Sequence, residues 1–211
     1  MNIITKHRIT NKSIEKIDTN RLLGGETAMI FYSDPHWSDG NLKYWNTMRN
    51  KMCGTTDEKV VTLEDMTKAI KNLINNHVDG YVILETGIKA LDFQQDLLQS
   101  IVKNIKVYDV FYKSGSKWKP NKILVGVTDK KYKFDIDLSG IKCDGFKLPD
   151  VIFEHIAKKD DLVIDPFMGL GNTGMACVKH DLKFAGNEFN EVRYNRAINN
   201  LNKSIKKYAR T

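Results

Sequence analysis

The segment that most constrains the fold is DLVIDPFMGLGNTGMACVKHDLKFAGNEFN, residues 161–190. A short apolar run ends in Asp165, a turn with Gly169 and Gly171 follows, and a helical pattern begins near residue 172. A second apolar run then ends in Glu188. A buried strand, a tight turn, a helix and a second buried strand make up the unit from which parallel sheets are built. The segment therefore predicts an α/β protein.

The rest of the chain repeats this alternation. Short apolar runs predict strands at 28–32, 79–86, 107–112 and 123–128. Helical spacing of apolar residues predicts helices at 62–76, 88–102, 148–158 and from about 190 onwards. Several strand-like runs are apolar throughout, which is typical of strands covered on both faces. We expect a single domain, residues 1–211, with a three-layer, mostly parallel twisted sheet. One antiparallel hairpin is expected at about 107–135, with a long polar loop at 113–122.

The glycine turn suits a ligand that contains a nucleoside. Glycines let the backbone turn sharply and let a ligand approach closely, and open N–H groups at a helix start favour polar or anionic groups. An acid at the end of the next strand, here Glu188, can accept hydrogen bonds from both ribose hydroxyls. The alternative is a packing turn that happens to use glycine, because G-x-G alone is a weak signal.

A second polar segment follows the first predicted strand. Asp34-Pro35-His36-Trp37 comes directly after the apolar run 28–32. Taken alone this is a turn, since Asp before Pro is common in turns. Its place after a buried strand, however, is also where open α/β sheets bind ligands.

The residues from Asp165 to Thr173 resemble the D-P-F-x-G-x-G-x-T signature of the DNA amino-methyltransferases, which methylate adenine N6 or cytosine N4 with S-adenosylmethionine. FAGNE, 184–188, is similar to the family's F-x-G-x-E, and Tyr194 and Ala197 fit its Y-x-x-A helix. KLP, 147–149, resembles a K-P element beside the cofactor site. The resemblance covers about residues 147–200 and implies a Rossmann-like methyltransferase fold. It implies S-adenosylmethionine binding by Asp165, Pro166, Phe167, Gly169, Gly171, Thr173, Glu188, Phe189 and Lys147.

The same resemblance gives the segment at Asp34 a catalytic role. The family carries [DNS]-P-P-[YFW] after a strand next to the cofactor strand. Here Asp34 and the Pro35 carbonyl would accept the hydrogens of the target amine, and Trp37 would stack on the extruded base. His36 replaces the usual second proline, so it either merely loosens the loop or adds a titrating group that redirects the reaction.

A basic surface is expected on the hairpin. The net charge of the chain is +7, and a positive field attracts polyanions. We expect nucleic acid, DNA rather than RNA, to contact Lys113, Lys117, Trp118, Lys119 and Lys122. The alternative is a solvated charged hairpin whose aromatic side chains pack inward.

Three other classes of site are not indicated. The three cysteines form no C-x-x-C pair, so neither a disulfide framework nor a metal site is expected, and the protein suits a reducing cytoplasm. No apolar run is long enough to span a membrane. The resemblance to the DNA amino-methyltransferases implies a methyltransferase acting on adenine N6 in DNA. A non-catalytic subunit, a cytosine N4 or RNA adenine target, and a homodimer or partner subunit remain open alternatives.

Overall fold

The computed structural model describes residues 2–4, 6–35, 38–55, 62–143 and 145–208. Its strands are β1 (Asn2–Ile4), β2 (His7–Thr10), β3 (Ala28–Ser33), β4 (Val78–Thr86), β5 (Lys103–Ser114), β6 (Lys117–Val127), β7 (Lys142–Cys143), β8 (Leu162–Asp165) and β9 (Lys183–Asn187). Its α-helices are α1 (Thr19–Leu23), α2 (Asp39–Cys53), α3 (Leu63–His77), α4 (Leu91–Gln99), α5 (Lys147–Ile156), α6 (Asn172–Lys179) and α7 (Glu191–Tyr208). Two 3₁₀ turns, η1 (Ile14–Lys16) and η2 (Ile88–Ala90), complete the described elements.

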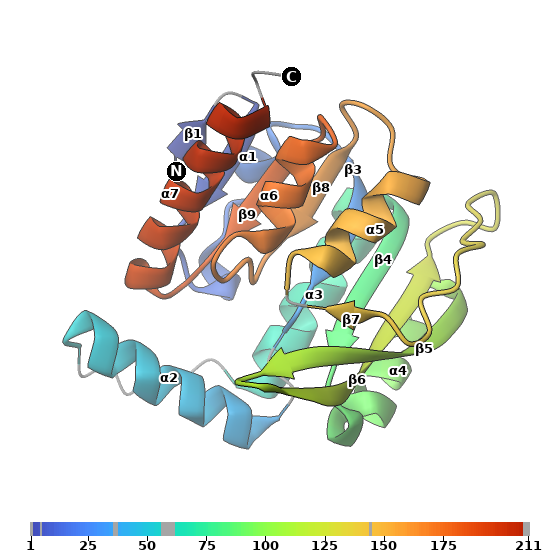
Figure 1. Ribbon diagram of the computed structural model, residues 1–211, viewed down its shortest axis with the longest axis horizontal. Coiled ribbons are helices and arrows are strands. Elements are labelled where there is room, and N and C mark those ends of the chain that lie inside the picture. The colour runs from blue at the N-terminus through green and yellow to red at the C-terminus, as the bar shows by residue number, and fades with distance from the viewer. Residues whose placement is uncertain (1, 5, 36–37, 56–61, 144, 209–211) are drawn as a thin grey trace.

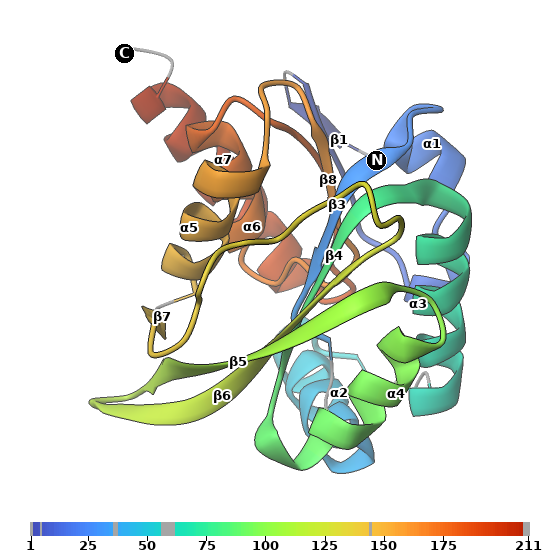
Figure 2. The same ribbon diagram turned by 90° about the vertical axis from the view of Figure 1, so that its right-hand side faces the viewer.

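Over these residues the strands form one nine-stranded sheet in the order β1-β2-β9-β8-β3-β4-β6-β5-β7 (Figure 1). The run from β2 to β4 is parallel throughout, β6 is antiparallel to β4 and β5, and β1 is antiparallel to β2. Figure 2 shows helices α5, α6 and α7 on one face and α1, α3 and α4 on the other. The expected three-layer, mostly parallel α/β fold is therefore confirmed.

Both faces of the central strands are buried, which explains their apolar sequences. On β3, Ile30 and Tyr32 pack into the core under α5–α7, whereas Ala28 and Phe31 pack into the core under α1, α3 and α4. On β4, Ile83 packs into the core under α5–α7, and Val82 packs into the core under α1, α3 and α4. Alternate side chains of a strand point to opposite faces, so a strand with two buried faces is apolar at nearly every position.

The prediction of a long loop in the hairpin is wrong. β5 continues to Ser114 and β6 starts at Lys117, and these two residues face each other across a tight turn. Gly115 supplies the positive φ of 62° that this turn needs. Pro120 lies within β6 beyond Lys122, where the pairing with β4 ends, and proline is tolerated on such an edge. Gly115 and Pro120 interrupt the sequence pattern, but they do not interrupt the two-stranded ribbon.

Two helical segments differ from the expectation. The predicted helix at 88–102 is a 3₁₀ turn, η2, followed by α4, which ends at Gln99. Helix α2 has no counterpart among the predicted elements, because its sequence is polar on nearly all sides. Of its described side chains, Leu42 is the one that is buried. α2 lies apart from the two helix layers, beyond the carboxyl ends of the strands (Figure 1).

Candidate active site

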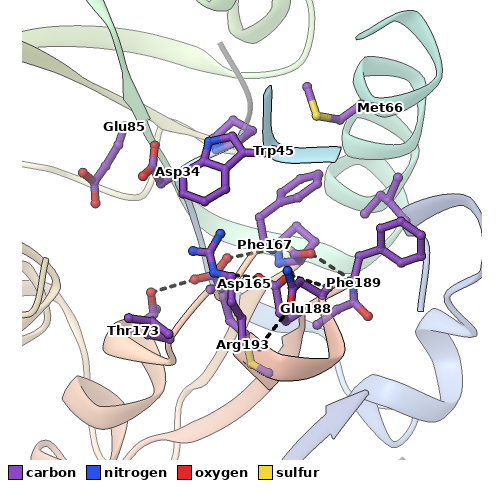
Figure 3. Close-up of a pocket in the computed structure, with 18 of the residues that line it drawn as sticks. Asp34, Trp45, Met66, Glu85, Asp165, Phe167, Thr173, Glu188, Phe189 and Arg193 are labelled. Atoms are coloured by element: carbon purple, nitrogen blue, oxygen red, sulfur yellow. Dashed lines mark hydrogen bonds and ion pairs between the residues drawn. The ribbon is translucent and has the colours of Figure 1, made fainter. Parts of the chain in front are cut away.

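Four carboxylates lie at the carboxyl ends of four neighbouring parallel strands. Glu188 follows β9, Asp165 ends β8, Asp34 follows β3, and Glu85 is the penultimate residue of β4. Because parallel strands end at the same edge of a sheet, residues from across the chain are brought into one row. All four line a cavity of about 510 Å³, shown in Figure 3.

Asp165 holds the glycine turn together. Its Oδ1 accepts a hydrogen bond from the Phe167 N–H at 3.0 Å, and its Oδ2 accepts one from the Thr173 hydroxyl at 2.7 Å (Figure 3). Burial, and then the negative charges of Asp34 and Glu188, raise the pKa of Asp165 to about 7, against the opposing effect of these hydrogen bonds. Asp165 therefore shapes the wall of the cavity through bonds to its own turn.

The two glycines of the turn have backbone conformations that side chains rarely adopt. Gly169 has φ 54° and Gly171 has φ 82°. A Cβ at Gly171 would also lie 3.2 Å from the Cβ of Ala197 on α7, and Gly171 caps the start of α6. The small Ala197 thus lets α7 pack directly on the turn, which explains why Gly171 and Ala197 occur together in the sequence pattern.

Glu188 is positioned to bind hydroxyl groups. It is 9% exposed, and its Oε1 accepts a hydrogen bond from the Asn190 N–H at 2.7 Å. Its Oε2 lies 3.9 Å from Nε of Arg193, an ion-pair distance that is too long for a hydrogen bond. Burial raises the pKa of Glu188, and the Arg193 charge opposes this shift. On the neighbouring strand end, the Asn11 side chain donates to the carbonyls of Glu188 and Phe189, at 2.6 and 2.9 Å.

Helix α2 forms one wall of the cavity through Asn41, Leu42, Trp45, Asn46 and Arg49. Two cation–π contacts connect this helix to Phe189, after β9, and to Arg193 of α7. The Arg49 guanidinium lies 4.0 Å from the ring centre of Phe189, and the Arg193 guanidinium lies 4.7 Å from that of Trp45. Phe189 remains 37% exposed, and Ile14 of η1 also lines the cavity. An aromatic ring and an apolar side chain that line the same cavity suit the flat face of a nucleobase.

The predicted catalytic segment lies only partly within the described residues. Asp34 and Pro35 line the cavity, whereas His36 and Trp37 are outside the part of the chain that the structure describes. Their roles therefore stay predictions. Tyr112 of β5 lines the same cavity, so the hairpin contributes an aromatic side chain to it.

The sequence did not single out Glu85, although it is half-buried beside Asp34 (Figure 3). Its Oε1 accepts a hydrogen bond from the Tyr32 hydroxyl at 2.6 Å. Burial, and then the charge on Asp34, raise the pKa of Glu85 to about 8. In the sequence, Glu85 is a single acid near the end of an otherwise apolar strand, and no recognisable motif surrounds it.

The other predicted residues lie outside this cavity. Lys147 is exposed at the start of α5, and Gly145 rather than Lys147 lines the cavity. On the hairpin, Lys113, Lys117 and Lys119 are exposed, and Trp118 is 39% exposed, so this ring does not pack inward. Lys122 forms an ion pair with Asp109 across the two strands.

Among the described residues, no group of three His, Cys, Asp or Glu side chains could hold a metal ion. The described helices also include none that is long and apolar enough to cross a membrane.

The fold has known relatives. In solved structures, M1.HpyAVI aligns with a TM-score of 0.64 and 17% identity, over 93% of this chain and 98% of its own. TTHA0409 from Thermus thermophilus, complexed with S-adenosyl-L-methionine, aligns with a TM-score of 0.60 and 14% identity, over 94% of each chain. The cytosine-N4-specific PvuII DNA methyltransferase aligns with a TM-score of 0.58 and 14% identity, over 97% of this chain and 94% of its own.

At these identities the structural likeness shows a shared fold. No curated protein sequence matches the chain. Residues 26–199, however, match the N6/N4 methyltransferase family model, which is described as DNA methylase. This match includes the glycine turn, both strand-end acids of the cofactor side, Asp34 and Glu85. The chain therefore belongs to the N6/N4 DNA methylase family.

Proposed function

We propose that the chain, folded as one domain, transfers a methyl group from S-adenosylmethionine to adenine N6 in DNA. The observation that carries this proposal is the single cavity in which Asp34, after β3, meets Asp165 and Glu188, after β8 and β9. Family membership supports DNA as the substrate. The complex of the structurally similar TTHA0409 with S-adenosyl-L-methionine supports the methyl donor.

The cofactor fits the half of the cavity next to β8 and β9. The Glu188 carboxylate lines the cavity and can accept from the ribose hydroxyls, and Phe189 with Ile14 offers an apolar surface for the adenine ring. A Cβ at Gly169 would lie 2.6 Å from the guanidinium of Arg193, so glycine at this position leaves room for the Arg193 side chain beside the cavity. When bound, S-adenosylmethionine would supply a methyl group on a sulfonium sulfur that leaves as a neutral thioether, so the chain has to bind and orient the reactants and take up the proton of the amine.

Asp34 and Pro35 act on the target amine. The lone pair of an exocyclic amine is delocalised into the ring, which makes the nitrogen a poor nucleophile. Asp34 and the Pro35 carbonyl accept its two hydrogens, which favours the tetrahedral form whose lone pair points at the methyl group. Asp34 then holds the proton that the nitrogen loses. Trp37 stacks on the extruded base.

The hairpin supplies contacts to the DNA backbone. The exposed Lys113, Lys117 and Lys119 neutralise phosphates without reading sequence, and the exposed Trp118 provides a face for stacking. Tyr112 extends the same ribbon into the cavity, next to the position of the target base.

The experiment is labelled-methyl transfer to unmethylated DNA, followed by mass spectrometry of the nucleosides. N6-methyladenine is the expected product. Asp34→Ala should lower the rate on the order of 100- to 10,000-fold, because it removes both the orienting acceptor and the base. Cofactor affinity, measured by calorimetry, should remain, because Asp34 follows β3, whereas the proposed cofactor contacts follow β8 and β9. A folded, cofactor-bound protein that methylates no DNA would contradict the proposal.

Cytosine N4 is the second candidate target, since the PvuII enzyme of similar fold is cytosine-N4-specific. The leading Asp of the segment at 34 favours adenine by its resemblance to the family pattern. The same mass spectrum decides between the two, because N4-methylcytosine and N6-methyladenine differ in mass and retention.

A further inference from the structure

Glu85 is a carboxylate that the proposed mechanism does not use. In the parallel pair β3–β4, Ser33 is the register partner of Leu84. The next residues on the two strands, Asp34 and Glu85, are therefore neighbours, roughly 5 Å apart between backbones. Both side chains extend into the same cavity, and Figure 3 shows the two carboxylates next to each other. An acid beside the amine acceptor thus faces the same ligand group.

The surroundings of Glu85 keep it a neutral acid near pH 7. Its pKa is raised to about 8 by burial first and by Asp34 second. The Tyr32 hydroxyl donates to Oε1 and stays protonated, because burial holds the pKa of Tyr32 well above 10. The Tyr32 hydroxyl thus occupies Oε1, and a proton on Glu85 would sit on Oε2.

The groups that face Glu85 come from five strands. Asp165 on β8 adds negative charge, and the register partner on β6 is the apolar Ile123. Tyr112 of β5 lines the cavity, and Cys143 of β7 lies close enough to affect the pKa of Tyr32. The nearest lysine of β6, Lys122, forms its ion pair with Asp109. The charges that act on Glu85 in this set are the negative ones of Asp34 and Asp165, which favour the neutral form of the acid.

We propose that Glu85 reads the target base by donating a hydrogen bond from Oε2 to the ring nitrogen next to the methylated amine, while Asp34 accepts from the amine itself. This inference rests on the proposed function. In adenine the carbon that bears N6 is bonded to N1, and in cytosine the carbon that bears N4 is bonded to N3. Both bases therefore present an amine donor beside a ring acceptor, which matches an ionised acid beside a neutral one.

The same pair disfavours the other two bases. Guanine and thymine carry a carbonyl in place of the amine and an N–H in place of the ring acceptor. Their carbonyl would face the ionised Asp34, and two acceptors without a hydrogen between them repel. A second ionised acid at Glu85 would add repulsion to Asp34 and leave the ring nitrogen without a donor.

The first test is the pH profile of kcat/KM for the cofactor-loaded protein on duplex DNA. For the wild type, the rate should fall about tenfold per pH unit above the pKa of Glu85, because the donor is lost. Glu85→Gln keeps an N–H donor for the base and a carbonyl oxygen that accepts from Tyr32, but it does not titrate. The fall of kcat/KM at alkaline pH should therefore disappear in this variant. Glu85→Ala should lose roughly tenfold or more across the whole range, since the ring nitrogen is left unpaired. If Glu85→Gln is as slow as Glu85→Ala at every pH, an ionised carboxylate is required and the inference is overturned.

The second test removes the ring acceptor instead of the donor. A target adenine is replaced by 1-deazaadenine, which lacks N1, or by the control 7-deazaadenine, which keeps it. The wild type should lose roughly tenfold on the first base alone, and Glu85→Ala should show no further loss on that base. Equal penalties of Glu85→Ala on both bases would overturn the inference while leaving methyl transfer intact. If cytosine is the target, the corresponding test base is 3-deazacytosine, which lacks N3. A wild-type protein that methylates neither base would overturn the proposed function and this inference together.

Discussion

The two halves of the cavity are built in different ways. On the cofactor half, the carboxylates of Asp165 and Glu188 accept hydrogen bonds from N–H groups two residues further along the chain. On the acceptor half, Asp34 and Glu85 come from strands separated by more than 40 residues of sequence. There Glu85 accepts from a side chain, Tyr32, of the neighbouring strand. Local backbone bonds fix the first half, and tertiary packing fixes the second.

This difference has a chemical consequence. The cofactor half binds a ligand that is the same in every turnover, so its acids are held rigidly by their own turns. The acceptor half must receive a base that enters from outside, and Tyr112 of the hairpin, from another part of the chain, lines the same cavity. We therefore expect substitutions on the cofactor half to act on stability and cofactor affinity. Those on the acceptor half should act on transfer and on pH dependence.

The largest effect on the cofactor half is expected at Gly171. Gly171→Ala combines an unfavourable positive φ with a Cβ 3.2 Å from Ala197. It should lower the free energy of unfolding by roughly 2–4 kcal/mol, measured by denaturant titration. Gly140→Ala is the matched control, because Gly140 has φ 76° and open space around its Cβ position. It should lose only about 1 kcal/mol. Equal losses at the two positions would mean that the contact with α7 does not constrain the turn.

A smaller loss is expected at Glu188, and it should appear in binding. Glu188→Gln removes a charged acceptor for the ribose hydroxyls and should weaken S-adenosylmethionine binding roughly 10- to 100-fold, measured by calorimetry. Glu191→Gln, at the exposed first residue of α7, is the control and should bind the cofactor normally. If Glu188→Gln instead lowers the transfer rate at saturating cofactor, the separation of the two halves fails.

The same contrast explains what the sequence could predict. The strands β3, β4, β8 and β9, the glycine turn and its acids follow from short contiguous patterns, and the structure places them as expected. The cap of α3 is local too, since the Thr62 hydroxyl accepts from the Asp65 N–H. Interactions of this kind involve residues a few positions apart, so a sequence pattern records them.

The missed features depend on contacts between distant segments. α2 is polar on nearly all sides, so its sequence shows no buried face. Its position becomes clear from two contacts near the other end of the chain, between Trp45 and Arg193 and between Arg49 and Phe189. Glu85 is one acid in a buried strand, and only the register with β3 places it beside Asp34. The hairpin was assigned a loop because Gly115 and Pro120 interrupt its pattern, although cross-strand pairing continues past both.

The free energy of unfolding should depend on pH through one buried acid from each half of the cavity, Glu85 and Asp165. The pKa values of Glu85 and Asp165 are raised to about 8 and about 7 in the folded chain. The folded state therefore keeps protons that the unfolded carboxyls lose at about pH 4, so stability should fall as pH rises through 4–8. Because Gln cannot ionise, Glu85→Gln should raise the free energy of unfolding at pH 8 by roughly 1–4 kcal/mol, where the upper figure is the full shift at about 1.4 kcal/mol per pKa unit, and leave it nearly unchanged at pH 4. Denaturant unfolding of both proteins at these pH values is the measurement. A difference independent of pH would show that Glu85 ionises normally.

The smallest effects are expected on the hairpin, which approaches the acceptor half from outside. Lys117→Ala and Lys119→Ala each remove an exposed charge, so each should reduce the salt dependence of DNA binding by about one unit in the log–log slope. The charge of Lys122 is compensated by Asp109, so Lys122→Ala should change this slope less than either. Fluorescence anisotropy with one duplex at several salt concentrations measures all three slopes. None of these variants should alter the pH profile of methyl transfer, because the hairpin lysines lie outside the cavity that holds Asp34 and Glu85. A slope change for Lys122→Ala equal to the other two would show that DNA displaces Asp109 from its lysine, and would bring that part of the ribbon into the binding surface.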